Sequence, residues 1–513
     1  MPRDARFPSC PARFSVFLGL GLGVLLYGCT RRSGDPARAL PSVRSAPALR
    51  RVGTHVASKS GAESVTYAVK LDAALTRLDV EVCPSGFRIE RLNAPSPGAQ
   101  TLLAGGHVVT LEGDVPCADE GVDLPSTKTD ECVSYAVDLP QKSSDPTALR
   151  RVDADVLASP DLWLWVPTPR PEGASLRVHF DLPPGVIAAV PWQNANGDAN
   201  GDANGTEFSL PESAFAWKSA GAFSHAPIEQ IELPQAKLRL ATLGAGFGAG
   251  SAAVREWIVQ GARTSSLLFG HFPVARALVI AVPVARSGPS FGMALRGGGP
   301  AVVILLKRDA NAATLADDWT ATHEFLHLGV PRLPPEDSWL FEGLATYYTE
   351  LTRARAGIIT PKQAYQHLLE GFERSRRGGG SSLTLREESA QMRERHSFYR
   401  VYWAGAAIAF LADVAARRAG TATLDGALRS FAECCASSER EATADSVLAA
   451  LAAFGATRLT TEAQRWLDSK EFPDVDEALR TLGVTFGGHG AAVFGRAPNA
   501  AIRDAIMARS ALP

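Results

Sequence analysis

Two histidines and a glutamate stand within five residues, in the run His323-Glu324-Phe325-Leu326-His327. On a helix, residues four apart lie one turn apart on the same face. Both imidazoles could therefore reach one Zn²⁺ at ~2.0–2.1 Å. Glu324, offset by about 100° around the helix, could reach a water bound to that metal and act as its base. Five residues also match by chance on an ordinary helix, so a zinc centre needs a third ligand.

Glu342 is the candidate for that third ligand. It stands near the start of a second apolar helix, expected to begin at Asp337 or Ser338. A carboxylate among apolar residues is usually paired or bound to a metal. The connection Val330–Glu336 is short and holds three prolines, so it would fold the second helix back beside the first. The alternatives are a solvated helix carboxylate, or Glu350 as the ligand from the same helix.

The helix that carries the histidines has its own boundary signals. Thr314, with Asp317 three residues later, reads as a variant capping box, and Gly329 and Pro331 would end the helix. These signals predict a helix over residues 315–328. A stripe on one side of it is expected to face a core, and consists of Leu315, Trp319, Thr322 and Leu326.

The HEFLH helix followed by Trp339-Leu-Phe-Glu-Gly-Leu-Ala-Thr-Tyr-Tyr348 resembles the gluzincin metallopeptidases. It is closest to the glycyl aminopeptidase family and more broadly resembles aminopeptidase N. The resemblance implies a thermolysin-like α/β catalytic domain and one zinc per chain, bound by His323, His327 and Glu342. It also implies that Glu324 is the general base. The spacer between His327 and Glu342 is shorter than in aminopeptidase N.

A downstream segment extends the resemblance. Phe398–Ala406 is similar to the family's Y-x-K-G segment, in which the tyrosine stabilises the tetrahedral oxyanion, and Tyr402 matches it. Ala404 replaces the usual lysine. An ordinary interfacial aromatic is the alternative for Tyr402.

Another segment bears on whether the enzyme would remove residues from the N-terminus of a peptide or cut within it. An edge strand within Ser290–Leu306 could pair with an extended peptide. In related enzymes a G-x-x-E stretch there binds the substrate's α-amine, but the comparable residues here run Gly292 to Arg296, with Leu295 in place of the glutamate. Arg296 would repel an ammonium group. We therefore expect weakened aminopeptidase action, unless a carboxylate of the β domain binds the amine.

Composition limits the fold class. The chain has 513 residues, of which 46% are hydrophobic and 21% charged. These values exclude disordered, collagen-like and polytopic membrane proteins. The net charge of −2 offers no basic field for nucleic acid. Short alternating runs followed by helical patterns predict a multidomain α+β protein, with an antiparallel β-sandwich, a catalytic domain and a helical end. The expected boundaries are 61–220, 221–420 and 421–513.

The first residues look like an export signal. Arg3, Arg6 and Arg13 precede an apolar run, Ser15–Tyr27, which is too short to span a bilayer. Residues 26–29 resemble a lipobox, in which Cys29 would become the lipidated N-terminus. The expected parts are a signal peptide over 1–28 and a flexible tether over 29–60. With Thr30 after the cysteine, an exported outer-membrane lipoprotein is expected. Cleavage without lipidation is the alternative.

Five cysteines remain outside the signal. Cys117 and Cys132 flank a short polar loop and are the expected disulfide pair. Cys434 and Cys435 lie on an apolar helical face, as core residues or as a disulfide end. The tract 194–205 faintly resembles a calcium loop but has Pro211 where a glutamate is needed, so a polar hairpin is preferred.

Three functions compete. The leading hypothesis is a lipid-anchored zinc peptidase that cleaves peptide or protein substrates outside the cytoplasm. A catalytically inactive scaffold is a second, although the intact Glu324 argues against it. The third is a zinc hydrolase of a non-peptide bond.

Overall fold

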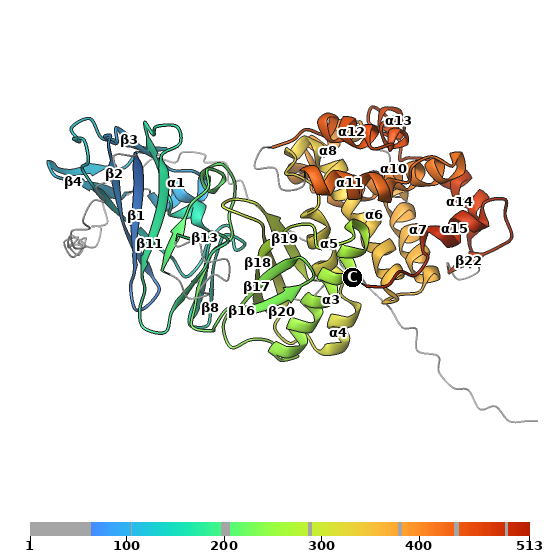
Figure 1. Cartoon of the computed structure of the whole chain (residues 1–513), viewed down its shortest axis with the longest axis horizontal. Helices are drawn as coiled ribbons and strands as arrows, with labels where there is room; N and C mark the ends of the chain where they lie inside the picture. Colours follow the sequence, from blue (N-terminus) through green and yellow to red (C-terminus); the bar gives the residue numbers. More distant parts are fainter. Residues whose placement is uncertain are drawn as a thin grey trace, which may run out of the picture.

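The computed structural model describes residues 63–103, 105–118, 120–195, 206–285, 290–377, 382–435, 441–487 and 491–512. The predicted signal peptide, Cys29, the tether and most of the tract 194–205 lie outside these residues. Figure 1 shows the chain as three neighbouring parts. Strands of the N-terminal part lie at one end, a smaller sheet with its helices lies in the middle, and a helical part lies at the other end. The multidomain α+β class is confirmed.

The N-terminal part is built from sheets that share one hydrophobic core. An eight-stranded sheet has the order β13-β14-β11-β1-β2-β7-β4-β5, and sheets of three and four strands, β10-β3-β6 and β12-β15-β9-β8, contribute to the same core. Strand β2 (Arg77–Ser85) alternates buried and half-buried residues, because successive side chains of a strand point to opposite faces. Buried aromatic rings fill the core, with Tyr135 stacked on Trp165 at a centroid distance of 3.9 Å.

The elements of this part have the following bounds: β1 (Ser64–Leu71), β3 (Arg91–Asn93), α1 (Pro97–Leu103), β4 (His107–Thr110), β5 (Gly113–Pro116), β6 (Gly121–Asp123), β7 (Val133–Asp138), β8 (Leu149–Val152), β9 (Asp155–Ala158), β10 (Val166–Thr168), β11 (Ser175–Asp181), β12 (Ile187–Ala189), β13 (Gln193–Asn194), β14 (Glu207–Ser209), α2 (Ser213–Ala216) and β15 (Ala222–Ser224).

A five-stranded sheet lies in the middle, with the order β16-β17-β18-β20-β19. Strands β17 (Ala236–Thr242), β18 (Arg276–Val284) and β20 (Ala301–Lys307) are parallel, whereas β16 (Glu229–Leu233) and β19 (Phe291–Leu295) pair antiparallel at the two edges. Helix α3 (Ser251–Phe269) crosses over between β17 and β18, as parallel strands require.

Both faces of this sheet are covered. One face shares a core with α3, α4 and the histidine helix, through residues such as Val279, Val254 and Phe325. The other face shares a core with the N-terminal part, through residues such as Ile280 and Leu157. Burial on both faces explains the almost continuous apolar sequence of β18.

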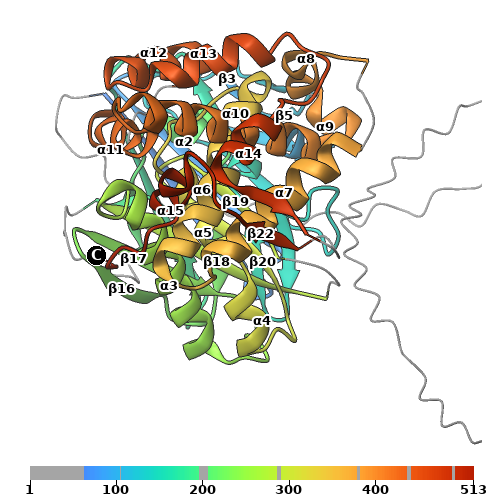
Figure 2. The same ribbon diagram turned by 90° about the vertical axis from the view of Figure 1, so that its right-hand side faces the viewer.

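Helices make up the rest of the chain. The long ones are α6 (Ser338–Ala356), α7 (Pro361–Arg377) and α10 (Phe398–Ala419). Figures 1 and 2 both place α12 and α13 at the outer edge of this part. The remaining elements are α8 (Leu385–Ala390), α9 (Met392–Arg395), α11 (Leu424–Cys435), α12 (Ala444–Ala453), α13 (Thr457–Trp466), α14 (Asp476–Leu482), β21 (Val484–Phe486), β22 (Ala492–Phe494) and α15 (Ala500–Ile506). No helix in the described part of the chain has the length and apolar character to cross a membrane.

The single helix predicted over 315–328 is wrong. The structure has two helices, α4 (Ala312–Asp317) and α5 (Thr320–His327), with a break at Asp318 and Trp319. The backbone N–H of Thr320 donates to the Asp318 carboxylate at 2.8 Å, so a side chain competes with helix continuation there. Thr314 is not the cap either, because Asn311 accepts from its N–H at 2.9 Å.

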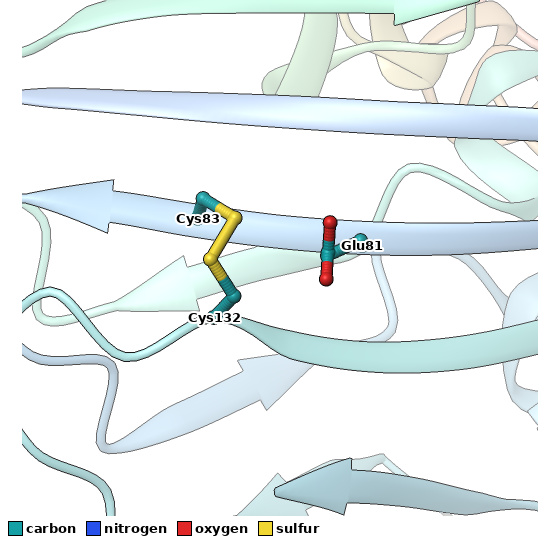
Figure 3. A group of neighbouring side chains, drawn as sticks. All are labelled: Glu81, Cys83 and Cys132. Atoms are coloured by element: carbon teal, nitrogen blue, oxygen red, sulfur yellow. A yellow bond between two sulfur atoms is a disulfide. The ribbon is translucent and has the colours of Figure 1, made fainter. Parts of the chain in front are cut away.

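The predicted Cys117–Cys132 pair is also wrong. Cys132 is bonded to Cys83 (Figure 3). Cys117 is free. The cause is strand pairing: β2 and β7 are neighbours, and Val82 is opposite Val133, so Cys83 and Cys132 meet just beyond the last pair. Burial raises the pKa of the Cys117 thiol to about 11. Cys434 and Cys435 are bonded to each other.

Candidate metal centre

Three side chains converge between α5 and α6. The Nε2 atoms of His323 and His327 lie 3.4 and 3.3 Å from the same Oε2 atom of Glu342. All three ligand atoms lie within 4.8 Å of one another. Ligands at ~2.0–2.1 Å from a tetrahedral ion are about 3.3 Å apart, so this arrangement fits zinc. Three protein ligands leave a fourth position for water or substrate, as in catalytic zinc sites.

A close helix crossing positions Glu342. A Cβ atom added at Gly343 would lie 2.5 Å from the backbone of Gly405, and one added at Gly405 would clash with the carbonyl oxygen of Trp339. Helices α6 and α10 therefore touch backbone to backbone one residue after Glu342. The same crossing brings Tyr402 of α10 to the metal cluster. The glycine of the Glu-Gly pair is thus a packing requirement.

Tyr402 lies over the metal cluster. Its ring is nearly parallel to that of His323, with the centroids 6.4 Å apart. Burial, together with the charges of Glu342 and Glu324 and a hydrogen bond to Glu342, holds the pKa of Tyr402 well above its ordinary value. The hydroxyl is therefore protonated and donates to Glu342. The structure brings together all five residues singled out from the sequence for zinc chemistry.

Glu324 is held between the metal cluster and strand β19. Its carboxylate accepts a hydrogen bond from the backbone N–H of Ala294. A Cβ atom at Gly292 would lie 2.6 Å from the Glu324 carboxylate, so any larger residue there would displace this side chain. Burial raises the pKa of Glu324 to about 7, against the lowering effect of His323. A bound cation would lower this pKa again, because it favours the charged carboxylate.

The pKa of Glu342 is shifted in the opposite direction to that of Glu324. Burial opposes ionisation of Glu342, but the facing His327 and His323 hold its pKa well below its ordinary value. Glu342 is thus an anion aimed at the point where the imidazole nitrogens meet. A cationic ligand would relieve the burial of this charge.

A residue that sequence reasoning missed orients His323. The Thr349 hydroxyl donates to the carbonyl of Ala345 at 2.7 Å, so its oxygen accepts from Nδ1–H of His323 at 3.2 Å. This assigns the proton of His323 to Nδ1 and leaves the lone pair of Nε2 facing Glu342. Such partners fix the tautomer and orientation of metal-ligating histidines. The available signal was the spacing, because Thr349 follows Glu342 by two helical turns on one face.

Arg296 does not stand over the site as a free cation, contrary to the expectation that it would repel a substrate amine. It is buried, and its Nη2 donates to the carbonyls of His327, Leu328 and Val330 at 3.2, 2.9 and 2.6 Å. A cation at this helix end is stabilised by the unpaired carbonyls and the helix dipole. Arg296 therefore fastens the end of β19 to the end of α5.

Two other candidates lie outside the cluster. Glu350, the alternative third ligand, is paired with His367 at 2.7 Å and with Arg353 at 3.8 Å. The other group of potential ligands in the described part of the chain is Glu81, Cys83 and Cys132, shown in Figure 3. Its two sulfur atoms form a disulfide and so offer no thiolate.

The comparisons with known proteins agree with this geometry. The family model of M61 glycyl aminopeptidase matches residues 332–407, the segment that holds Glu342 and Tyr402. The matched segment resembles the glycyl aminopeptidases, and it supplies Glu342 to the metal cluster. This match and the cluster of His323, His327 and Glu342 support a zinc metallopeptidase, a hydrolase with a zinc cofactor. No curated protein matches the chain.

A solved structure shows a similar fold at low sequence identity. The chain is similar to an aminopeptidase N family protein from Idiomarina loihiensis, with a TM-score of 0.68 and 16% identity over 82% of this chain and 78% of that one. An M1 zinc metallopeptidase from Deinococcus radiodurans matches with a TM-score of 0.49 and 16% identity, over 80% of this chain and 95% of that one. The first of these likenesses supports the fold only.

Proposed function

We propose that this chain is a zinc peptidase that cleaves peptide bonds by hydrolysis, with His323, His327 and Glu342 as the metal ligands and Glu324 and Tyr402 as catalytic residues. The observation that carries the proposal is the meeting of both Nε2 atoms and one Glu342 oxygen at distances of a tetrahedral zinc site, with a second carboxylate beside them. A purely structural histidine pair would need no such base.

Each side chain has a role that follows from its position. When bound, zinc lowers the pKa of its water towards ~7 and polarises the substrate carbonyl. Glu324 accepts the proton of the attacking water and later passes it to the leaving amine. The protonated Tyr402 donates its hydroxyl hydrogen to the oxyanion as that charge develops. Thr349 holds the lone pair of His323 towards the metal.

Strand β19 is the proposed substrate edge. It is the last strand of its sheet, so one side of its backbone has no strand partner among the described residues. An extended peptide could add to this edge by main-chain hydrogen bonds. The amide of Ala294, which reaches Glu324, lies on this free side.

We propose endopeptidase action, or a preference for substrates without a free α-amine, over strict aminopeptidase action. Leu295 stands where related enzymes have the amine-binding glutamate, and its side chain packs into the core shared with the N-terminal part. A leucine cannot pair with an ammonium group. The test is a set of matched peptides with free and acetylated N-termini, and stepwise cleavage of the free forms alone would overturn this proposal.

A peptide-library digest with the zinc-loaded chain tests the central proposal. Glu324→Gln should retain one zinc and lose ~10²–10⁴-fold of the activity, because it removes the base and leaves the ligands. Zinc binding without cleavage of any peptide would favour an inactive scaffold or a hydrolase of another bond. Equal activity in wild type and Glu324→Gln would remove Glu324 from the mechanism.

We also propose that the chain is exported and anchored in the outer membrane through lipid on Cys29. The proposed segments and domains have the boundaries given in the sequence analysis. The N-terminal sheets are proposed to form a sandwich. The support is the charged start, the short apolar run and the lipobox-like end at Cys29. Cys29→Ser should move the protein from the membrane to the soluble fraction of an exporting cell. A wild-type protein found wholly soluble after export would contradict the anchor and leave the peptidase proposal intact.

A further inference from the structure

Trp319 is exposed where the sequence pattern expected burial. Its side chain is 38% exposed, whereas Leu315, Thr322 and Leu326 of the same expected stripe are buried. The helix break at Asp318 turns the indole away from that stripe. The other large apolar side chains that are exposed in the described part of the chain lie away from α5 in the sequence. They are Leu111, Phe454, Phe486, Val493 and Leu512.

The exposed indole lies against a metal ligand. Its ring meets that of His323 edge to face, with the centroids 5.2 Å apart. Its position is fixed by the backbone, since the carbonyl of Trp319 accepts the N–H of His323 at 3.1 Å. Next to it, Ser290 donates to the Asp318 carboxylate at 2.6 Å and ties the start of β19 to this point. Trp319 is therefore an ordered apolar surface beside the zinc centre and the substrate edge.

Contacts along β19 show how this strand runs relative to helix α5. Ser290 lies beside Asp318 before α5, Ala294 beside Glu324 within α5, and Arg296 beside His327 and Val330 at its end. Strand and helix thus run in the same direction. A peptide added antiparallel to β19, the commoner pairing, runs the opposite way. Its residues after the scissile bond then lie towards Trp319.

We infer that Trp319 is a specificity-determining residue: it forms one wall of a subsite for a large apolar side chain on the residue that follows the scissile bond. The inference rests on the proposed peptidase function and deepens it by naming a substrate class, peptides with Phe, Leu or a similar residue at that position. An aromatic wall favours such side chains by area buried and by ring contact.

The test uses the zinc-loaded full chain and two peptide series. One series differs only in Phe or Ala after the scissile bond, the other only in Phe or Ala before it. Wild type should prefer Phe after the bond by ~10-fold or more in kcat/KM, a typical gain for an apolar pocket. Trp319→Ala should reduce that preference to about 2-fold, and Trp319→Phe should restore part of it. Phe454→Ala, which removes an equally exposed ring elsewhere, should change neither series.

Binding provides a second readout that does not depend on turnover. Calorimetry of the same peptides on zinc-loaded Glu324→Gln, with and without Trp319→Ala, should give the same change in preference. A preference left intact by Trp319→Ala, or altered only in the series before the bond, would overturn the inference. If no peptide is cleaved, the proposed function fails, and the calorimetric ratio still decides whether Trp319 forms the wall. If Trp319→Ala does not fold, Trp319→Leu replaces it.

Discussion

The helical side and the strand side of the zinc centre are built in different ways. On the helical side, α6 and α10 touch at Gly343 and Gly405, and no side chain separates them. On the strand side, β19 pairs with β20 alone, and all five of its residues are only partly buried. Core packing therefore fixes the metal ligands, whereas the proposed substrate edge is left accessible.

Buried charges strengthen the helical side further. Asp413 of α10 accepts hydrogen bonds from Tyr347 and Arg417, both at 2.9 Å. Asp425 of α11 accepts from Tyr348 at 2.9 Å, and also from Arg355 and Arg417. These pairs join α6 to α10 and α11 within four turns of Glu342. Breaking one partner of such a network is costly, because a buried charge is left unpaired.

The crossing of α6 and α10 should give the largest effect. Gly405→Ala places a methyl group against the carbonyl of Trp339, and overpacking of this kind costs ~1–3 kcal/mol. We expect a lower melting temperature together with loss of zinc affinity, measured by thermal unfolding and metal titration. Gly426→Ala, a helix position with room for a methyl group, is the control and should lose neither property. Normal zinc affinity in Gly405→Ala would contradict the account of the helical side.

A methyl group on the strand side should reduce the rate of catalysis and leave the stability of the fold unchanged. Gly292→Ala would displace the Glu324 carboxylate, whereas β19 is an edge strand with space to shift. We expect ~10²–10³-fold lower kcat, within the range for losing a general base, with unchanged melting temperature and zinc content. A large fall in stability with kcat preserved would show that the two sides do not differ as described.

Tyr402 tests whether the helical side supplies an oxyanion donor as well as a ligand. Tyr402→Phe keeps the ring beside His323 and removes only the hydroxyl, so kcat should fall ~10²-fold while zinc affinity stays the same. Tyr399→Phe is the control, since its ring lies near Arg374 at 5.2 Å. The roles would be exchanged if Tyr399→Phe lost activity and Tyr402→Phe did not.

Thr349 should give the smallest effect. Thr349→Val keeps the shape but removes the acceptor of Nδ1–H of His323, which should weaken zinc binding ~10–100-fold. Thr352→Val is matched to it, because that hydroxyl bonds only to the backbone of its own helix. Competition with a chelator measures both variants. Equal zinc affinities of Thr349→Val and wild type would deny that Thr349 orients the ligand.

Local patterns in the sequence predicted what depends on local structure. The spacing of His323 and His327 and the start of α6 at Ser338 both follow from residues close to one another in the chain. Failures occurred where a distant partner decides the result. Cys132 pairs with Cys83 because two strands are neighbours, and Arg296 is buried because the end of α5 lies beside it.

The helix break at Asp318 is an intermediate case. Its side chain accepts from Thr320 two residues later, a local contact that helical periodicity does not include. The break also exposes Trp319, which the expected stripe had placed in the core. Aspartate is a common residue at helix starts, so Asp318 itself is a sequence signal for the break and for the exposure of Trp319.

The central claim is that His323, His327 and Glu342 together hold one zinc. The most direct measurement is the zinc content per chain after dialysis, in wild type, Glu342→Ala and Glu350→Ala. Both variants remove a carboxylate from α6, but Glu350 is paired with His367 and lies outside the cluster. We expect one zinc in wild type and in Glu350→Ala, and none in Glu342→Ala. One zinc retained by Glu342→Ala and lost by Glu350→Ala would contradict the claim.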